Sequence, residues 1–293
     1  MGAIEISRKA PQMSRHSLHA DHRTQADTFY TFENSGAQAA TRFSALADIF
    51  DPGTIRHLTE IGVGRGWHCL EIGAGGGSIA TWLCDRVGDT GQVLATDIDT
   101  RFLETLHRSN LEVSRHDITV DPLPQAKFDL VHCRLVVGHL PNRDEVLGRL
   151  VAALRPGGWI LAEEFDSWSL RPDRSINDAE TSLKAFAEMQ SVLGRHGFDG
   201  YFGRRLVARL RAHDLAEIFA EGRVFMYEGG TTSGADLTRA GISQTRDEMI
   251  DAGGISPADI EHDLLQLSRP DFMMPSPIMW AVRGRRPRGR QVP

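Results

Sequence analysis

The stretch Cys69–Leu83, CLEIGAGGGSIATWL, decides the fold of this chain. It begins as an apolar run typical of a buried strand and continues, over residues 78–87, with apolar residues at helical spacing. Four glycines occupy the five positions 73–77 between these two runs. Glycine lets the backbone turn tightly and approach a ligand, and the N-terminus of a helix offers unpaired N–H groups. The stretch therefore predicts a strand, a binding loop and a helix.

The spacing of these glycines excludes one kind of loop and weakens the case for another. A phosphate-binding loop of the Gly-Lys-Ser/Thr type is excluded, because no lysine follows the glycines. A dinucleotide fingerprint, Gly-x-Gly-x-x-Gly, that starts at Gly73 requires a third glycine where the chain has Ser78. A tight turn without any ligand remains the alternative to a nucleoside-binding loop.

Strand-like and helix-like runs alternate around this stretch. The strand-like runs cover residues 68–74, 92–99, 111–118, 128–135, 159–166, 222–229 and 278–287, and the helix-like runs cover 24–50, 54–63, 78–87, 101–110, 144–154 and 204–215, with Asp-Pro-Gly at 51–53 as a break. Strands separated by helices of about 10–15 residues predict crossover connections and a mostly parallel sheet. We therefore expect an α/β fold in which one sheet of about seven strands carries helices on both faces.

Acidic residues stand near the ends of the first three expected strands. Glu71 precedes the glycines by two positions, Asp97 and Asp99 end the second strand, and Asp117 ends the third. Asp97 lies 24 positions beyond Gly73, where an acid can accept hydrogen bonds from both hydroxyls of a ribose. The carboxyl ends of parallel strands meet at one edge of a sheet, so these acids are expected to line one crevice. For each acid alone, a helix cap or a loop position is the alternative.

The composition excludes several classes of protein. The net charge of −6 disfavours a large nucleic-acid interface, and the basic run Arg283–Arg290 is interpreted as a solvated tail. No apolar stretch approaches the roughly 20 residues of a membrane span, and the N-terminus has no apolar signal segment. The three scattered cysteines form no disulfide or zinc pattern. We therefore expect a cytoplasmic protein that acts without nucleic acid, membrane or metal.

Five segments of this chain resemble, in order and spacing, the motif series of class I S-adenosylmethionine-dependent methyltransferases. They are LEIGAGGGS (70–78), VLATDID (93–99), RHDI (115–118), FDLVHCR (128–134) and LRPGGWILAEEFD (154–166). The resemblance covers residues 67–166, and the flanking segments are similar to those of actinobacterial, natural-product-type methyltransferases. It implies a Rossmann-like sheet of seven strands whose last strand runs antiparallel. It also implies S-adenosyl-L-methionine as the cofactor, with S-adenosyl-L-homocysteine as its product.

The resemblance assigns the cofactor site as well. It implies that residues 73–75 pass under the methionine part and the ribose, with Glu71 beneath the amino group. Asp97 then binds the ribose hydroxyls, and Asp117 accepts a hydrogen bond from the adenine amino group. The full set of expected cofactor-binding residues is Glu71, Gly73, Ala74, Gly75, Ser78, Asp97, Ile98, Asp99, Asp117, Ile118, Cys133 and Arg134.

Four segments make up the expected domain organisation. Residues 1–50 form a helical N-terminal lid, and residues 51–168 form the Rossmann-like core that binds the cofactor. Residues 169–203 form a helical insertion after the fifth strand, which caps the substrate. Residues 204–293 complete the sheet and add further cap helices and the basic tail.

Catalytic residues are harder to predict, because the cofactor carries the activated methyl group and the protein mainly orients the acceptor. A base is needed only if the acceptor must lose a proton. The candidates are His139, which follows the fourth strand, Tyr30 in the lid, and Asp166 at the end of the fifth strand. A structural histidine and an aromatic packed in the lid are the alternatives for the first two. Tyr30, Glu164 and Trp168 are the expected substrate-binding residues.

The expected function is the transfer of a methyl group to oxygen, nitrogen or carbon of a small, aromatic or indole-type secondary metabolite. Methylation of RNA or protein is a second hypothesis, and the acidic balance disfavours RNA. A nicotinamide-dependent reductase and a non-catalytic protein that binds S-adenosylmethionine are further alternatives. A homodimer is left open.

Overall fold

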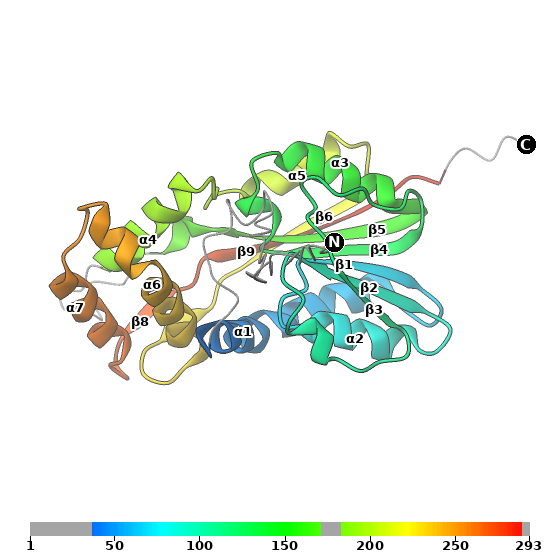
Figure 1. Ribbon diagram of the computed structural model, residues 1–293. Coiled ribbons are helices and arrows are strands. Elements are labelled where there is room, and N and C mark those ends of the chain that lie inside the picture. The colour runs from blue at the N-terminus through cyan, green and yellow to red at the C-terminus, as the bar shows by residue number, and fades with distance from the viewer. Residues whose placement is uncertain (1–36, 171–182, 289–293) are drawn as a thin grey trace, which may run out of the picture.

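The computed structural model describes residues 37–170 and 183–288 of the chain and centres on a seven-stranded sheet with the order β3-β2-β1-β4-β5-β9-β6 (Figure 1). Strands β1 to β5 run parallel, whereas β9 lies antiparallel to both β5 and β6. The mostly parallel seven-stranded sheet and its antiparallel last strand are thereby confirmed. The strands are β1 (His68–Ile72), β2 (Gln92–Asp97), β3 (Leu111–Arg115), β4 (Phe128–Arg134), β5 (Leu154–Asp166), β6 (Ala216–Arg223) and β9 (Ile278–Arg285).

Helices cover both faces of this sheet (Figure 1). One face packs on α3 and α5 and the other on α1 and α2, and each interface encloses its own cluster of buried apolar side chains. Strands β1 and β4 lie in the middle of the sheet and are buried over almost their whole length, as parallel strands usually are, although each carries buried polar residues. The helices are α1 (Ala37–Ile61), α2 (Ser78–Val87), α3 (Arg143–Ala153), α4 (Lys184–Arg195), α5 (Leu206–Arg211), α6 (Ser233–Asp251) and α7 (Pro257–Leu267).

A third buried cluster lies at one end of the molecule, on the left in Figure 1. It joins α4, α6 and α7 to a separate two-stranded sheet made of β7 (Met226–Glu228) and β8 (Met273–Pro275). Helix α6 packs on both α1 and α4, so this end is continuous with the helix that covers the main sheet. None of the helices in residues 37–170 and 183–288 is long and apolar enough to cross a membrane.

The break predicted at residues 51–53 is wrong, because α1 continues through Pro52 to Ile61. A proline inside a helix removes one backbone hydrogen bond, which tertiary contacts must offset. Here the side chains of Asp51 and Thr54, on either side of the proline, both accept hydrogen bonds from Arg134 of β4. The helix is therefore fixed to the sheet at the point where the local sequence predicts its end.

The helix predicted over residues 101–110 is also wrong. The segment contains only a short 3-10 turn at Leu103–Thr105. Leu103 is fully buried, and the side-chain amide of Asn110 donates hydrogen bonds to the carbonyls of Cys84 and Gly88 at the end of α2. These contacts draw the segment across the end of α2 and leave it no room to form a helix of its own.

The sixth strand of the main sheet lies earlier than predicted. It is β6, Ala216–Arg223, so only the first two residues of the predicted strand 222–229 belong to it. Residues 226–228 of that run form β7, which lies outside this sheet. Strand β6 is an edge strand with exposed or half-buried side chains, so it lacks the apolar pattern that marks the central strands. Strand β5 also begins earlier than predicted, at Leu154, because residues 155–158 form a bulge within it.

Candidate active site

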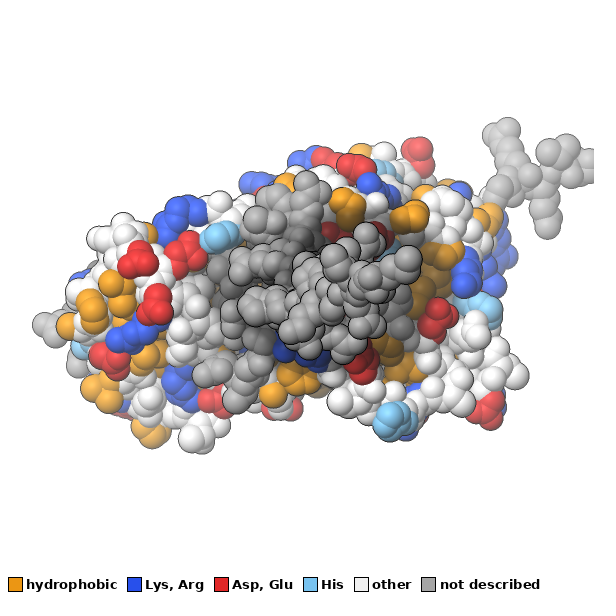
Figure 2. Space-filling view, in the orientation of Figure 1, with side chains coloured by type: hydrophobic (Ala, Val, Ile, Leu, Met, Phe, Trp, Pro, Cys, Tyr) orange, Lys and Arg blue, Asp and Glu red, His pale blue; other side chains and the backbone are white. Residues whose placement is uncertain are grey.

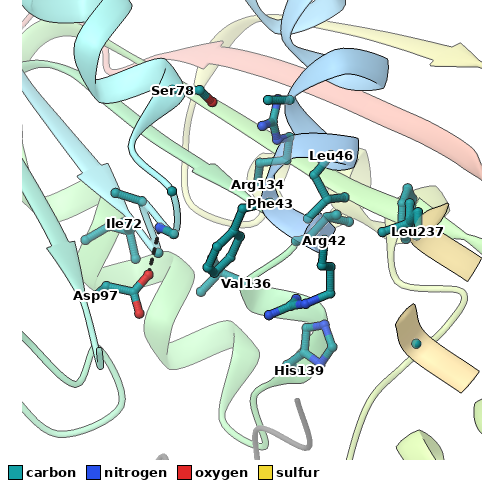
Figure 3. A pocket seen from close by; sticks show the side chains of 18 of the residues that line it. Arg42, Phe43, Leu46, Ile72, Ser78, Asp97, Arg134, Val136, His139 and Leu237 are labelled. Carbon is teal, nitrogen blue, oxygen red and sulfur yellow. Dashed lines mark hydrogen bonds between the residues drawn. The ribbon is translucent and has the colours of Figure 1, made fainter. Parts of the chain in front are cut away.

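A cavity of about 460 Å³ lies at the carboxyl ends of β1, β2 and β4. The glycine loop after β1 and the end of β2 form one part of its wall, and α1, α4 and α6 form another. Figure 3 shows Asp97 on one side and Leu237 of α6 on the other, with Phe43 and Leu46 of α1 between them. The volume lies in the range of about 300–1,000 Å³ that small-molecule sites occupy.

The glycine loop has a backbone conformation that other residues rarely adopt. Gly73 and Gly75 have φ angles of 66° and 53°, in the left-handed region. A Cβ atom at Gly73 would stand 2.3 Å from Cγ2 of Val136, and one at Gly75 would stand 2.8 Å from the ring of Phe43. The loop is therefore packed so closely between α1 and the turn after β4 that only glycine fits at these positions. Ser78, which begins α2, lines the cavity directly beyond the loop.

Asp97 and Asp117 line the same cavity from the ends of neighbouring strands. Asp97 is 8% exposed, and its carboxylate accepts hydrogen bonds from the backbone N–H groups of Gly75 at 2.9 Å and Asp99 at 3.1 Å. Burial raises the pKa of Asp97, although these hydrogen bonds oppose the shift. Asp117 accepts a hydrogen bond from the backbone N–H of Thr119 at 2.9 Å. Both acids are thus held by backbone donors with part of each side chain left toward the cavity.

Residues that suit a flat aromatic ring surround these acids. Ile98, Phe102, His116 and Ile118 all line this part of the cavity. Both ring nitrogens of His116 are buried and have no hydrogen-bond partner among the described residues. Adenine offers nitrogen atoms that can pair with such a ring, so the residues present fit a nucleoside. His116 is not predicted from the sequence, although its place directly before Asp117 is a usable signal.

Glu71 lines the cavity beneath the glycine loop and is bonded to a buried histidine. Its Oε2 atom lies 2.7 Å from Nδ1 of His132 on β4, and Nε2 of the same ring lies 3.1 Å from Oε2 of Glu163 on β5. Burial alone would lower the pKa of His132, but the two carboxylates outweigh it and raise the pKa to about 9. The ring is therefore an imidazolium at neutral pH. His132 is not predicted from the sequence.

Arg134 connects the end of β4 to α1 while lining the cavity. Its guanidinium donates hydrogen bonds to Thr54 at 2.9 Å and to Asp51 at 2.8 Å. The next residue, Leu135, has a φ of 57°, which is strained for leucine. Its backbone N–H donates to the Glu163 carbonyl at 2.8 Å, which holds it there. The chain thus turns sharply into the cavity wall directly after β4.

Glu164 supports this turn from below. Its Oε1 atom accepts hydrogen bonds from the backbone N–H groups of Val136 at 3.0 Å and Gly138 at 3.1 Å. Burial raises the pKa of Glu164 to about 7, because the hydrogen bonds only partly offset the loss of water. The turn that carries His139 is therefore fixed by a buried carboxyl group.

His139 lines the cavity and stacks on Phe198, with 4.5 Å between the ring centroids. Burial and the positive charges of Arg42 and Arg143 lower the pKa of His139 to about 3. Figure 3 shows the guanidinium of Arg42 of α1 beside His139. The histidine is therefore a neutral ring at physiological pH, because the nearby arginines disfavour a further positive charge.

Two of the predicted cofactor residues do not line the cavity. Cys133 is fully buried in the apolar cluster between the sheet and the helices α3 and α5, because alternate side chains of β4 point to opposite faces. Asp99 forms an ion pair with Arg101 outside the cavity. The remaining ten, from Glu71 to Arg134 along the chain, all lie in its wall: Glu71, Gly73, Ala74, Gly75, Ser78, Asp97, Ile98, Asp117, Ile118 and Arg134.

Three predicted residues at the end of β5 likewise lie outside the cavity wall. Glu164 is directed to the turn described above. Asp166 accepts hydrogen bonds from Arg204 at 2.7 Å and from the backbone N–H of Trp168 at 3.0 Å. The Trp168 side chain is 62% exposed and stacks under Arg204. Tyr30 lies outside the described residues.

The wall opposite the glycine loop consists of residues that are not predicted from the sequence. They are mostly apolar and come from α1, α4, α6 and the segments next to them: Leu46, Phe186, Met189, Leu193, Phe198, Tyr227, Leu237 and Thr238. No motif marks them, since most are single positions on a helix, and Phe198 and Tyr227 lie in a loop and in β7. Within residues 37–170 and 183–288, no group of three His, Cys, Asp or Glu residues is arranged to hold a metal ion.

Comparison with known proteins identifies the family. Residues 70–160 match a family model described as a methyltransferase domain. The ubiquinone/menaquinone biosynthesis C-methyltransferase UbiE of Laribacter hongkongensis is 30% identical over 187 residues, which are 59% of this chain and 74% of that protein. Methyltransferase str3 of Strobilurus tenacellus is 30% identical over 163 residues, which are 55% of this chain and 57% of that protein. The match thus spans little more than half the length of the Strobilurus relative.

Solved structures share the fold at lower identity. A Haemonchus contortus phosphoethanolamine N-methyltransferase 2, in complex with S-adenosylhomocysteine, has a TM-score of 0.55 and 15% identity and covers 89% of this chain and 60% of its own. The YcgJ protein of Bacillus subtilis has a TM-score of 0.52 and 15% identity and covers 81% of this chain and 100% of its own. Together with the motif series and the sheet order, these matches show that the chain belongs to the class I S-adenosylmethionine-dependent methyltransferases.

Proposed function

We propose that this protein transfers a methyl group from S-adenosylmethionine to a small, mainly apolar aromatic molecule. One observation carries the proposal: a single cavity is lined on one side by the glycine loop with Asp97 and Asp117, and on the other by apolar side chains from α4 and α6. The first side suits a nucleoside, and the second suits an aromatic acceptor. Both ligands would therefore share one space, as direct transfer between them requires.

On the first side, the backbone of residues 73–75 would lie under the methionine part and the ribose. Asp97 would accept hydrogen bonds from the ribose hydroxyls, while the Gly75 N–H holds its carboxylate in place. Asp117 and His116 would hold the polar edge of adenine, and Ile98 would pack on its face. Each of these residues lines the cavity, which is what supports the assignment.

On the second side, aromatic and aliphatic side chains would enclose the acceptor. Phe186 and Met189 lie on α4, and Leu237 lies on α6. The stacked rings of Phe198 and His139 also line the cavity. Aromatic side chains favour flat acceptors through offset or edge contacts. A small phenolic, quinol-type or indole-type molecule matches this lining better than a charged or extended one.

The bound cofactor supplies an electrophilic methyl group on a sulfonium ion. The residues of this chain have to align the acceptor with that methyl group and exclude water, and alignment supplies up to about 7–11 kcal/mol in favourable systems. His139 would orient the acceptor as a neutral ring. With a pKa of about 3, His139 binds a proton only weakly, so it would not act as a general base. The acceptor would then either attack the methyl group before it loses its proton or release the proton to another group.

Oxygen, nitrogen and carbon remain the proposed acceptor atoms. Relatives named as C-methyltransferases of ubiquinone and menaquinone biosynthesis support carbon as one of them. Tyr30 is proposed to contact the acceptor from the N-terminal segment. Asp166 is proposed to act through Arg204 and Trp168, which it holds at the end of β5.

A small molecule is favoured over a nucleic acid by the surface charge as well. On the face shown in Figure 2, acidic and basic side chains alternate and no broad basic field appears among the coloured atoms. The overall charge of −6 agrees with this distribution. A nucleic-acid substrate would require a continuous basic face to neutralise phosphates.

Methyl transfer from isotopically labelled S-adenosylmethionine tests the proposed function. The acceptor panel contains phenols, quinols, indoles and cyclic dipeptides, with tRNA, DNA and a protein mixture beside them. Label in one class of aromatic small molecule is the expected result, and at a low concentration of S-adenosylmethionine it should be reduced when the Asp97→Ala protein replaces the wild type. Label in tRNA, DNA or protein would overturn the substrate class, and wild-type protein that binds no S-adenosylmethionine would overturn the activity.

A further inference from the structure

A line of buried hydrogen bonds crosses the sheet directly beneath the cavity. It begins at Glu71 on β1, passes through the ring of His132 on β4, and reaches Glu163 on β5. The distances are 2.7 Å from Oε2 of Glu71 to Nδ1 and 3.1 Å from Nε2 to Oε2 of Glu163. All three side chains are at least 94% buried, so water does not compete for these bonds.

The line continues from Glu163 to α1. The hydroxyl of Thr54 donates to Oε2 of Glu163 at 2.6 Å and itself accepts a hydrogen bond from Arg134 at 2.9 Å. Arg134 also donates to Asp51 at 2.8 Å. Glu71 and Arg134, near the two ends of this line, both belong to the cavity wall. The position of Glu71 is therefore connected to the sheet and to α1 by fixed hydrogen bonds.

The groups along this line include one more carboxyl group than basic groups. It contains three carboxyl groups, Asp51, Glu71 and Glu163, and two basic groups, His132 and Arg134. The carboxyl group that faces the cavity is Glu71, whose Oε2 is bonded to His132. Burying carboxylates without partners is costly, so a positively charged ligand group at the Glu71 end would complete the balance.

We propose that His132 is a positioning residue that fixes the Glu71 carboxylate to receive the amino group of the methionine part of S-adenosylmethionine. The inference rests on the proposed function, because it takes the cofactor as the ligand of the glycine loop. His132 does not line the cavity, so it acts only through Glu71. The ring makes one hydrogen bond on each side. The bond from Nδ1 fixes the orientation of the Glu71 carboxylate, and the bond from Nε2 to Glu163 prevents the ring from rotating.

Two amide substitutions separate this role from a merely structural one. The amide nitrogen of asparagine replaces Nδ1 of a histidine, and that of glutamine replaces Nε2. His132→Asn therefore keeps the donor to Glu71 and loses the one to Glu163, whereas His132→Gln does the reverse. Both variants lose the same positive charge, so any difference between them reports which hydrogen bond matters.

Calorimetric titration with two ligands tests the inference. S-Adenosylhomocysteine carries the amino acid part, and 5′-methylthioadenosine has the same nucleoside and thioether without it. We expect His132→Gln to raise the Kd for S-adenosylhomocysteine by about 10-fold or more, as loss of a charge-assisted hydrogen bond does, and His132→Asn by less than about 3-fold. The Kd for 5′-methylthioadenosine should stay within about 2-fold in both variants. His68→Gln, at the opposite end of β1, is the matched control and should change neither constant.

Equal losses in the two variants, or a parallel loss of both ligands, would overturn the inference, as would unchanged binding of S-adenosylhomocysteine by His132→Gln. Wild-type protein that does not bind S-adenosylhomocysteine would overturn the proposed function itself, which is a distinct result. If the single variants unfold, the same pair is compared in a Glu163→Gln background. That background replaces one buried carboxylate as well as the buried cation and so restores the charge balance.

Discussion

The backbone N–H of Gly75 donates a 2.9 Å hydrogen bond to the carboxylate of Asp97. This bond joins the glycine loop after β1 to the end of β2 in the cavity wall. It holds the acid where a ribose would meet it and shows that the loop and the acid form one structural unit. The assignment of the cofactor to this side of the cavity depends on that unit.

Replacing Asp97 by alanine should weaken binding of S-adenosylmethionine by about 1–3 kcal/mol, because charge-assisted hydrogen bonds to the ribose are lost. Isothermal titration measures the change. Asp99→Ala is the matched control, since Asp99 lies two positions on, pairs with Arg101 and does not line the cavity. Equal effects of the two substitutions would show that the ribose does not lie on Asp97.

A Gly73→Ala protein should lose both stability and cofactor binding. The left-handed backbone costs alanine about 1–2 kcal/mol, and the new Cβ would meet Val136 at 2.3 Å. Gly62→Ala is the control, because Gly62 also has a positive φ, of 89°, but nothing lies within 4 Å of its Cβ position. Urea unfolding should show a larger loss for Gly73→Ala than for Gly62→Ala, and S-adenosylhomocysteine should bind normally only to the latter. Similar losses in both would mean that Val136 moves aside freely.

Stability should fall as the pH rises from neutral toward about 9. The pKa of His132 is raised from an ordinary value of 6.5 to about 9, so the folded protein holds a proton that the unfolded chain releases between these values. This contribution is fully present below pH 6.5 and is lost as the pH rises through 9. Thermal unfolding between pH 6 and 10 measures it, and His132→Asn should flatten the alkaline decline. An equally steep decline in that variant would assign the effect to other groups.

His139→Ala should lower kcat/KM by about 10-fold through loss of the ring that stacks on Phe198 and orients the acceptor. The pH dependence of kcat between pH 6 and 8 should keep its shape, because a ring with a pKa near 3 does not titrate there. His107→Ala, at an exposed position outside the cavity, is the control. An acid limb that is present in the wild type and absent from His139→Ala would show instead that this ring accepts a proton.

The part of the fold that is readable from sequence is the part whose signals are local. The strand before Gly73, the glycine loop and α2 occupy one continuous stretch. Asp97 ends β2, and Asp117 lies two positions after β3. Parallel pairing then places these acids at one edge without any further information. Most of the expected cofactor residues consequently lie in the cavity wall.

The part that is not readable depends on contacts between distant segments. His132 is one of alternating residues in β4, and only the pairing of β4 with β1 and β5 places it between Glu71 and Glu163. Pro52 marks a break in the local sequence, but Arg134 holds α1 together around it. Edge strand β6 carries no apolar pattern to reveal it.

The acceptor wall escapes prediction for the same reason. Leu46, Met189 and Leu237 come from three helices, and each resembles an ordinary core residue in its own segment. Only the packing of α6 against both α1 and α4 makes them face one cavity. In the proposed function, substrate selectivity would therefore depend on an arrangement of helices, whereas cofactor binding would depend on motifs.

A crystal structure of the protein with S-adenosylhomocysteine would locate the nucleoside and the sulfur atom together. We expect the ribose hydroxyls on Asp97, the adenine between Ile98 and Ile118, and the sulfur directed toward the wall that carries His139 and Leu237. A nucleoside bound outside this cavity, or one whose sulfur faces away from that wall, would contradict this expectation.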